Sequence, residues 1–215
     1  MRGDAPRHRL PDTGAFGRRV GGDRVGRPCG RRVAWVVVMR FAYADPPYLG
    51  MGKLYADRHP EAMLWDDPAT HQALVTRLCD EWPDGWAMSL HVPSLRVILP
   101  MCPADVRLMA WVKPFASFKP GVRVAYAWEP VIVRGGRHIP SRHNDTVRDW
   151  TAANATMRRG FPGAKPRKFC RWLFEVLNAQ PGDTLDDLFP GSGAVGAAWA
   201  EYVGEKCPLP SLPLA

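Results

Sequence analysis

The sequence predicts an α/β fold, and its 215 residues suit one domain of that class. The run Val33–Ala44 is apolar, rich in β-branched and aromatic residues, and stopped by two prolines, as expected for a buried strand. Near the other end, a short strand over residues 185–189 leads through a glycine-rich turn into an alanine-rich helix over residues 194–202. Strand–turn–helix units of this kind are typical of α/β proteins.

Alternating helical and extended patterns fill the middle of the chain. Residues 68–82 predict a helix, because Ala73, Leu74, Leu78 and Trp82 fall on one side of it. A strand over residues 125–133 contains Pro130, which predicts an edge strand or a bulged one. The remaining expected elements are a strand over 86–90, a short helix over 94–102, a strand over 106–112 and a helix over 167–177.

The tetrad Asp45-Pro46-Pro47-Tyr48 follows the first strand directly. In open α/β sheets, ligands bind beyond the carboxyl ends of the strands. The two prolines make the backbone rigid and leave its carbonyls free to accept hydrogen bonds. Asp45 adds a carboxylate acceptor, and Tyr48 adds a flat face on which a base can stack. The tetrad therefore suits a planar amino group, although a plain Pro-Pro loop after a strand is the alternative reading.

The glycine-rich turn matches Gly191-x-Gly193-x-x-Gly196, the spacing of dinucleotide-binding proteins. That fold also needs a further strand ending in an acidic residue about 20 residues later, and the sequence continues instead into a proline-rich tail. A nicotinamide-dependent dehydrogenase is therefore disfavoured. A P-loop is excluded as well, because no Gly-Lys-Ser/Thr follows the turn.

Taken together, the two motifs resemble those of methyltransferases that use S-adenosylmethionine to methylate amino groups. Asp45-Pro46-Pro47-Tyr48 looks like their catalytic motif, and Asp187-Leu-Phe189-Pro-Gly191-Ser192-Gly193 looks like their cofactor motif. The catalytic motif comes first in the chain, as in the permuted β-type DNA N6-adenine methyltransferases of phages and actinobacteria. Lys165-Pro166, and the stretches at 111–113 and 128–135, also resemble that family, over residues 36–202 in all.

The resemblance implies a Rossmann-like methyltransferase fold with circularly permuted motif order. It implies that Asp45 and a proline carbonyl hold the N6 amino group of a flipped adenine in DNA, with Tyr48 against the base. Asp187, Phe189, Gly191, Ser192, Gly193, Lys165 and Pro166 would surround S-adenosylmethionine. RNA adenine and cytosine N4 are alternative targets, since the same motif serves all of them.

One departure from the family pattern concerns the ribose of the cofactor. The acidic residue that usually holds it is missing, so the fold is expected to be truncated after the helix of the cofactor motif, with Glu201 or Glu205 as weak substitutes. Two further alternatives follow: a non-catalytic DNA-binding relic of the family, and a chain completed by a partner or by a second copy in a homodimer.

Basic segments indicate where DNA would bind. Residues 1–32 hold nine arginines and three aspartates, so they carry +6 of the net charge of +8 and are expected to be a disordered basic arm. Residues 33–206 are expected to form the methyltransferase domain, with a target-recognition segment over 134–164, and 207–215 a proline-rich tail. The individual DNA-contacting candidates are Lys53, Lys113, Lys119, Arg137 and Arg142.

Neither metal binding nor secretion is indicated. His138 and His143 have no cysteine or carboxylate at metal-ligand spacing. The five cysteines show no C-x-x-C pair and suggest reduced thiols, which predicts a cytoplasmic protein. The run Val33–Ala44 is too short to cross a membrane and contains Arg40.

Overall fold

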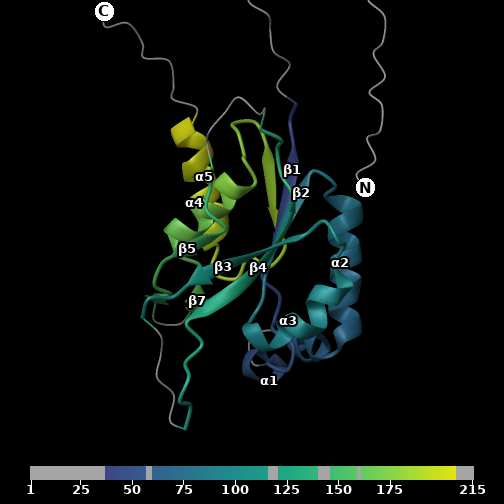
Figure 1. Cartoon of the computed structure of the whole chain (residues 1–215). Helices are drawn as coiled ribbons and strands as arrows, with labels where there is room; N and C mark the ends of the chain where they lie inside the picture. The colour runs from purple at the N-terminus through teal and green to yellow at the C-terminus, as the bar shows by residue number, and fades with distance from the viewer. Residues whose placement is uncertain (1–36, 57–59, 116–120, 140–145, 159–160, 207–215) are drawn as a thin grey trace, which may run out of the picture. The chain divides into compact units, whose positions relative to one another are not determined.

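A six-stranded mixed sheet forms the centre of the computed structural model (Figure 1). The structure describes residues 37–56, 60–115, 121–139, 146–158 and 161–206. The strand order is β5-β3-β4-β2-β1-β8, and only β4 runs against its neighbours. The strands are β1 Arg40–Ala44, β2 Gly85–Ser89, β3 Arg107–Val112, β4 Trp128–Gly135, β5 Trp150–Ala152 and β8 Thr184–Asp187.

Helices cover both faces of this sheet, which confirms the predicted α/β class (Figure 1). One face carries α2 (Pro68–Glu81) and α3 (Val92–Ile98), and the other carries α4 (Arg167–Val176) and α5 (Ala194–Lys206). The smaller elements are α1 Gly52–Tyr55, the 3-10 helices η1 Pro60–Asp66 and η2 Leu99–Met101, and the hairpin of β6 Thr156–Arg158 and β7 Phe161–Ala164.

Strand β1 shows how the sequence produces two cores. Phe41 and Tyr43 point toward α4 and α5, whereas Ala42 and Ala44 belong to the cluster that packs on α2 and α3. Successive strand residues face opposite sides, so a continuous apolar strand is buried on both faces. The predicted strand over 33–44 is therefore confirmed for 40–44, and residues 33–36 lie outside the described part.

The predicted helix over 68–82 is confirmed as α2, which ends one residue earlier. Its start is well determined by the sequence. Asp67 is the N-cap, and its side chain accepts the backbone N–H of Ala69 at 2.9 Å. Pro68 occupies the first turn, where its missing N–H costs nothing.

The prediction that Pro130 marks an edge or bulged strand is wrong. Strand β4 lies between β2 and β3, and neither pairing shows a register shift. The reason lies in where Pro130 stands. The last β2–β4 pair is Ser89 with Val131, and the Pro130 carbonyl accepts the N–H of Leu90 just beyond it. The missing N–H of Pro130 therefore faces the place where β2 ends, so it interrupts no pair inside the sheet.

The segment over 134–164 contains strands that were not predicted. β5 extends the main sheet by pairing in parallel with β3, and β6 pairs with β7 in a separate hairpin. All the parallel strands of the main sheet end at one edge, where β1, β2, β3 and β8 have their carboxyl ends. Within the described residues no helix has the length and apolarity needed to span a membrane.

Candidate active site

The two sequence motifs meet at this carboxyl edge because β1 and β8 are parallel neighbours. Tyr43 is in register with Asp187, and the N–H of Leu188 donates to the Tyr43 carbonyl at 2.9 Å. Asp45 therefore leaves β1 where the glycine-rich turn leaves β8. The two motifs, which stand at opposite ends of the sequence, therefore lie side by side in the structure.

An open pocket of about 990 Å³ lies at this edge. Four parts of the chain line it: the tetrad, the turn after β8, the α1–η1 region, and the ends of β3 and β4 with Lys165. The lining residues include Tyr43, Asp45, Pro46, Pro47, Tyr48, Tyr55, Glu61, Trp65, Trp111, Lys113, Glu129, Lys165, Phe189, Gly191 and Ser192.

A network of charges occupies the floor of the pocket. Lys165 Nζ lies 3.0 Å from Asp45 Oδ1 and 3.6 Å from Glu129 Oε2. Lys113 forms an ion pair with the other oxygen of Glu129. The Tyr48 hydroxyl lies 3.4 Å from Asp45 Oδ1 and 3.3 Å from Glu129 Oε2. The two carboxylates thus contact the hydroxyl of Tyr48, and the two ammonium groups pair with these carboxylates.

The pKa values in this network follow from burial and pairing. Burial raises the pKa of Asp45, and the nearby Lys165 only partly opposes this. For Glu129, burial also acts upward, but Lys165 and Lys113 outweigh it and the pKa is lowered. Burial acts to lower the pKa of Lys165, yet Asp45 and Glu129 together raise it. Lys165 and Glu129 are therefore charged at neutral pH.

The imidazole ring of His91 packs against one face of the Tyr48 ring. The two rings are stacked, with centroids 5.1 Å apart and an interplanar angle of 4°. His91 Nδ1 in turn shares a hydrogen bond of 2.7 Å with Ser94 Oγ in the first turn of α3. Tyr48 thus keeps one face of its ring against His91, and its hydroxyl is held by the two carboxylates.

The turn after β8 has the conformation that its glycines predict. Gly191 has φ 46° and Gly193 has φ 72°, a region that favours glycine. The N–H of Gly193 donates to the Pro190 carbonyl at 2.7 Å, and the Ala197 N–H then donates to Gly193 as α5 begins. A Cβ atom on Gly193 would meet nothing within 4 Å, so this glycine leaves open space.

Asp187 stands out because both its side-chain oxygens are buried without a hydrogen-bond partner among the described residues. Burial raises the pKa of this carboxyl to about 6. The backbone N–H of Phe189 acts to lower this pKa, but neither oxygen accepts a hydrogen bond of good geometry from the described residues. A buried carboxylate with so little hydrogen bonding is costly, and such groups often mark ligand sites. Asp187 ends β8 immediately before the pocket-lining residues of the turn.

The wall formed by α1 and η1 closes the pocket on the side of α2. Gly52 is buried, and its N–H donates to Asp66 Oδ1 at 2.9 Å. A Cβ atom at Gly52 would lie 2.8 Å from the Ala62 carbonyl, so only glycine fits. Trp65 of η1 packs edge-on against Phe189 at 5.1 Å between ring centroids, which ties this wall to the turn after β8.

The other predicted residues fall in different places. Pro166 is the N-cap of α4, next to Lys165, and Lys53 is exposed on α1. Arg137 lies at the opposite edge of the sheet and pairs there with the buried Asp183, so the structure does not bring it to the pocket. Lys119 and Arg142 lie outside the described residues.

The two proposed substitutes for a ribose-binding acid are also occupied elsewhere. Glu201 pairs with Arg167 at 2.8 Å, and Glu205 pairs with Arg167 and Arg171 between α5 and α4. Among the described residues no cluster of three or more His, Cys, Asp or Glu side chains has the arrangement of a metal site.

Sequence reasoning missed Glu129 and Trp65, which line the pocket, and His91, which stacks on Tyr48. Glu129 is an acidic residue near the start of the buried strand β4, and a charged residue in an otherwise apolar strand could have indicated a functional site. His91 and Trp65 carried no such signal, because the contacts that bring them to Tyr48 and Phe189 join separate elements.

Comparison with known proteins gives weak likenesses only. No model of a known protein family matches the sequence, and no curated protein matches it significantly. Among solved structures, the chain is similar to the M1.HpyAVI–SAM complex, with a TM-score of 0.48 and 16% identity over 77% of this chain and 79% of that chain. A candidate DNA modification methylase from Thermus thermophilus gives a TM-score of 0.38 and 12% identity over 79% of this chain and 88% of that chain.

Proposed function

We propose that this chain transfers a methyl group from S-adenosylmethionine to the N6 amino group of adenine in DNA. The observation that carries this proposal is that the Asp45–Tyr48 tetrad and the glycine-rich turn after β8 line one pocket. One motif suits a planar amine and the other suits a nucleotide-like cofactor. The sequence resemblance described above supports adenine as the base and DNA as the polymer.

The base side of the pocket offers the groups that such an amine needs. The Asp45 carboxylate and a proline carbonyl of the tetrad are acceptors for the two amino hydrogens. The Tyr48 ring, supported by His91, presents a flat face to a planar base. The adenine nitrogen is a poor nucleophile, because its lone pair is delocalised into the ring. Hydrogen bonds to these acceptors favour a more tetrahedral nitrogen.

The cofactor side fits S-adenosylmethionine on two observations. The unpartnered oxygens of Asp187 suit a donor such as an ammonium or amide group. The turn at Gly191 and Gly193 lets a ligand approach the backbone closely, and Phe189 and Ser192 line the space beside it. Bound there, the cofactor supplies an electrophilic methyl group on a positively charged sulfur.

The transfer balances without a metal ion or oxidant. The amino nitrogen forms a bond to the methyl carbon while the carbon–sulfur bond breaks, and the electron pair of that bond stays on sulfur. The nitrogen becomes positively charged, and Asp45 stabilises this charge before the proton passes to its carboxylate and on to water. Holding the two reactants in line supplies much of the acceleration.

Lys165 and Glu129 keep Asp45 ready for this role. Lys165 opposes the effect of burial on the pKa of the Asp45 carboxyl, and Glu129 forms ion pairs with Lys165 and Lys113. Because Asp45 lies in the pocket and not on the surface, an adenine within a duplex must leave the base stack to reach it.

The proposal is tested by incubating the protein with labelled S-adenosylmethionine and unmethylated DNA. The DNA is digested to nucleosides, which are identified by mass. We expect N6-methyladenine from the wild type and none from Asp45→Asn, which keeps the shape but removes the anionic acceptor. Asp105→Asn is the matched control, since Asp105 forms an exposed ion pair with Arg134 away from the pocket.

Methylcytosine as the product would assign the chemistry to another base. No product with cofactor bound, on DNA of random sequence and on RNA alike, would overturn the proposal.

A further inference from the structure

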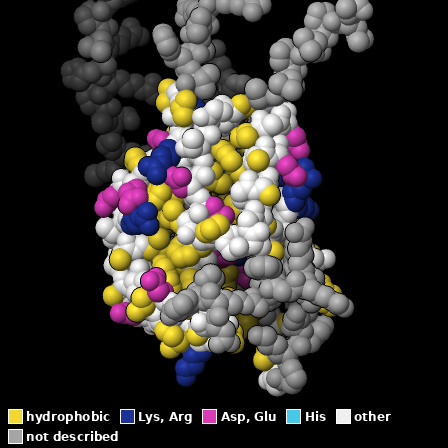
Figure 2. Space-filling view, turned by 180° about the vertical axis from the view of Figure 1, so that it is seen from behind, with side chains coloured by type: hydrophobic (Ala, Val, Ile, Leu, Met, Phe, Trp, Pro, Cys, Tyr) yellow, Lys and Arg dark blue, Asp and Glu magenta, His cyan; other side chains and the backbone are white. Residues whose placement is uncertain are grey.

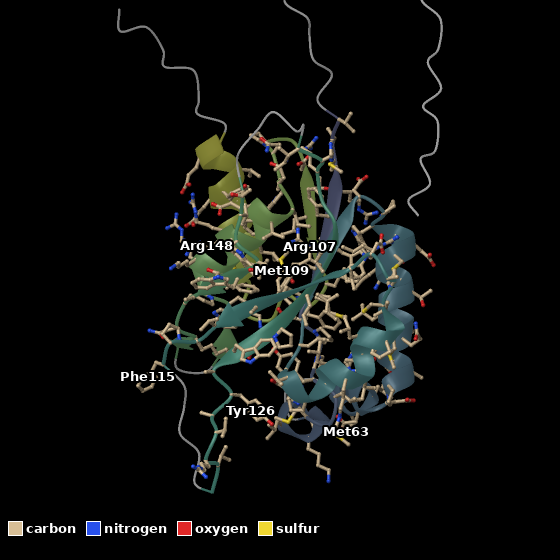
Figure 3. All side chains as sticks on the ribbon, viewed as in Figure 1. Met63, Arg107, Met109, Phe115, Tyr126 and Arg148 are labelled. Atoms are coloured by element: carbon tan, nitrogen blue, oxygen red, sulfur yellow. The ribbon has the colours of Figure 1, made fainter. Side chains whose placement is uncertain are left out.

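The connection between β3 and β4 leaves the sheet at the edge that carries the pocket. Lys113 and Glu129, at the two ends of this connection, both line the pocket. The N–H of Lys113 donates to the Ala127 carbonyl at 2.7 Å, so the connection is closed at its base. We call its described residues, 113–115 and 121–127, the β3–β4 arm. Figure 3 shows Phe115 and Tyr126 of this arm at the same end of the structure as α1.

Large apolar side chains of the arm are exposed to solvent. Phe115 is 72% exposed, Val124 80% and Tyr126 65%, and Val122 is exposed as well. Scattered apolar residues are normal on a protein surface, but four on one short connection indicate a contact surface. The arm does not use these side chains to pack on the sheet.

The charge of the connection identifies the kind of partner. Residues 113–127 contain two lysines and one arginine and no aspartate or glutamate. Arg123 is exposed and forms no ion pair with the residues that the structure describes. A carboxylate-free segment that combines cations with exposed aromatic rings complements a chain of phosphates and bases.

The face of the molecule seen in Figure 2 differs from the arm in how its charges are paired. Most of its lysine and arginine side chains stand beside aspartate or glutamate side chains, so their charges compensate each other. Ion pairs of this kind join Arg167 to Glu201 and Arg171 to Glu205 on α4 and α5. Lys113 is paired with Glu129, so Arg123 is the cation without an ion pair among the described residues of the arm, and it stands among exposed apolar side chains.

We propose that the β3–β4 arm binds DNA by stacking Tyr126 and Phe115 on unpaired bases beside the target nucleotide. This inference rests on the proposed function, because the bases that the arm would bind are those next to the target nucleotide after the target has entered the pocket. Arg123 contacts a neighbouring phosphate. The arm begins at Lys113 and returns to Glu129, both of which line the pocket with Asp45, so the bases next to a target held there are the ones assigned to it.

Binding of a fluorescein-labelled single-stranded oligodeoxynucleotide of mixed sequence, measured by anisotropy without any methyl donor, tests the arm. We expect Tyr126→Ala and Phe115→Ala each to weaken binding by roughly tenfold, since each removes one base–aromatic stack. Tyr126→Trp should bind as well as the wild type. Arg123→Ala should lower the salt dependence of binding, whereas Tyr126→Ala should leave it unchanged.

Leu108→Ala is the matched control. Leu108 is an apolar side chain with 43% exposure on β3, near the strand end that lies away from the pocket. Its loss should not change the affinity for the oligonucleotide. Equal losses in Leu108→Ala and Tyr126→Ala would overturn the stacking role, because they would indicate a general effect of apolar surface.

A second measurement locates the contact directly. An oligodeoxynucleotide containing 5-iododeoxyuridine is irradiated in the complex, and the cross-linked peptide is identified by mass. Adducts on Tyr126 or Phe115 support the proposal, and adducts confined to residues outside the arm overturn it. Because neither measurement needs methyl transfer, DNA binding through the arm with no methylated product would reject the proposed function alone.

Discussion

Lys165 is the residue on which the chemistry of the pocket depends most. Only 5% of its side chain is exposed, and it lies between the carboxylates of Asp45 and Glu129. A buried ammonium group is stable only when it is paired, and the two acids provide the pairing. Its distance of 3.0 Å from Asp45 makes it the main influence that opposes the effect of burial on that carboxyl.

Replacing Lys165 with methionine should therefore change both the rate and its pH dependence. Without the ammonium group, the pKa of Asp45 rises further above its ordinary value, so the anionic form is lost at a higher pH as the solution is acidified. We expect about a hundredfold lower kcat at neutral pH, with the acid limb of the pH–rate profile moved to higher pH. Lys165→Arg should restore the position of that limb in part. An unmoved limb in Lys165→Met would contradict this role.

Asp187→Asn should separate stability from binding. The pKa of Asp187 is about 6 in the folded protein, above the value of an unfolded aspartate, so its charge opposes folding. The loss of unfolding free energy caused by this charge is absent below about pH 4 and grows between about pH 4 and 6. Above that range it has its full value. We expect the variant to gain about 1–2 kcal/mol in unfolding free energy at pH 7.5, after allowance for solvent screening, and nothing at pH 4.

The same variant should bind S-adenosylmethionine more weakly in titration calorimetry, because the anionic acceptor is gone. Denaturation curves at the two pH values check the first expectation. A loss of stability at pH 7.5 would show that the Asp187 carboxylate is satisfied in the folded protein, contrary to our reading of its buried oxygens.

His91→Ala tests whether the stacked imidazole positions Tyr48. An aromatic pair of this kind contributes about 0.5–1.5 kcal/mol, so we expect kcat to fall about two- to tenfold with cofactor affinity unchanged. His91→Phe keeps a flat ring in contact with Tyr48 and should restore the rate. Equal loss in both variants would indicate that the hydrogen bond to Ser94, and not the stack, matters.

At the scale of single elements, the wall made by α1 and η1 shows how closely the pocket is built. Gly52→Ala places a methyl group 2.8 Å from a backbone carbonyl, which cannot move aside as a flexible side chain would. We expect a loss of about 1–3 kcal/mol in unfolding free energy, typical of overpacking. Methyl transfer should fall as well, since Trp65 and Glu61 on this wall line the pocket.

Gly196→Ala in α5 is the opposite case and serves as the control. A Cβ atom there meets nothing within 4 Å, and alanine favours a helix over glycine. Its stability should stay the same or rise by up to about 1 kcal/mol. Chemical denaturation gives the unfolding free energies of Gly52→Ala and Gly196→Ala. Equal destabilisation by the two substitutions would refute the steric argument.

Elements with strong local patterns were predicted, and elements defined by distant partners were not. β1, α2 and the turn after β8 follow from apolar runs, a capping aspartate and glycines with positive φ. β5 has three residues, and Trp150 and Ala152 are not fully buried, so only its pairing with β3 makes it a strand. The wrong prediction of an edge or bulged strand at Pro130 has the same origin. Pro130 disturbs no hydrogen bond of the sheet only because β2 ends opposite it, and the sequence of β4 does not show this.

The site follows the same rule. Asp45, Tyr48, Lys165 and Gly191 were predicted because a motif gave their positions in the sequence, and the structure places them around one pocket. The partners that orient them, such as Glu129 and His91, come from other elements and share no spacing with the motifs. Arg137 is the opposite case. Its charge and its polar segment predicted a DNA contact, but its side chain pairs with Asp183 at the edge of the sheet that lies opposite the pocket.

At the scale of the whole molecule, positive charge is distributed unevenly along the chain. Residues 1–32 carry +6 of the net charge of +8, and the described residues from 37 to 206 form a unit of their own. We expect a chain that lacks residues 1–32 to unfold at the same temperature and to bind DNA with a smaller salt dependence, because fewer phosphates are neutralised. Affinities measured across a salt series check this. An unchanged slope would mean that these arginines do not contact DNA.

The pairing of β1 with β8 also has a consequence for how the protein is made. The N–H of Met39, just before β1, donates to Asp183, just before β8, across 144 residues of chain. A ribosome has therefore synthesised Asp45 long before the glycine-rich turn that lines the same pocket exists. Closing so long a loop is slow, and the emerging chain must keep β1 soluble until β8 arrives. The pocket that the tetrad and the turn after β8 line together can therefore form only after β8 has been synthesised, however early the tetrad appears.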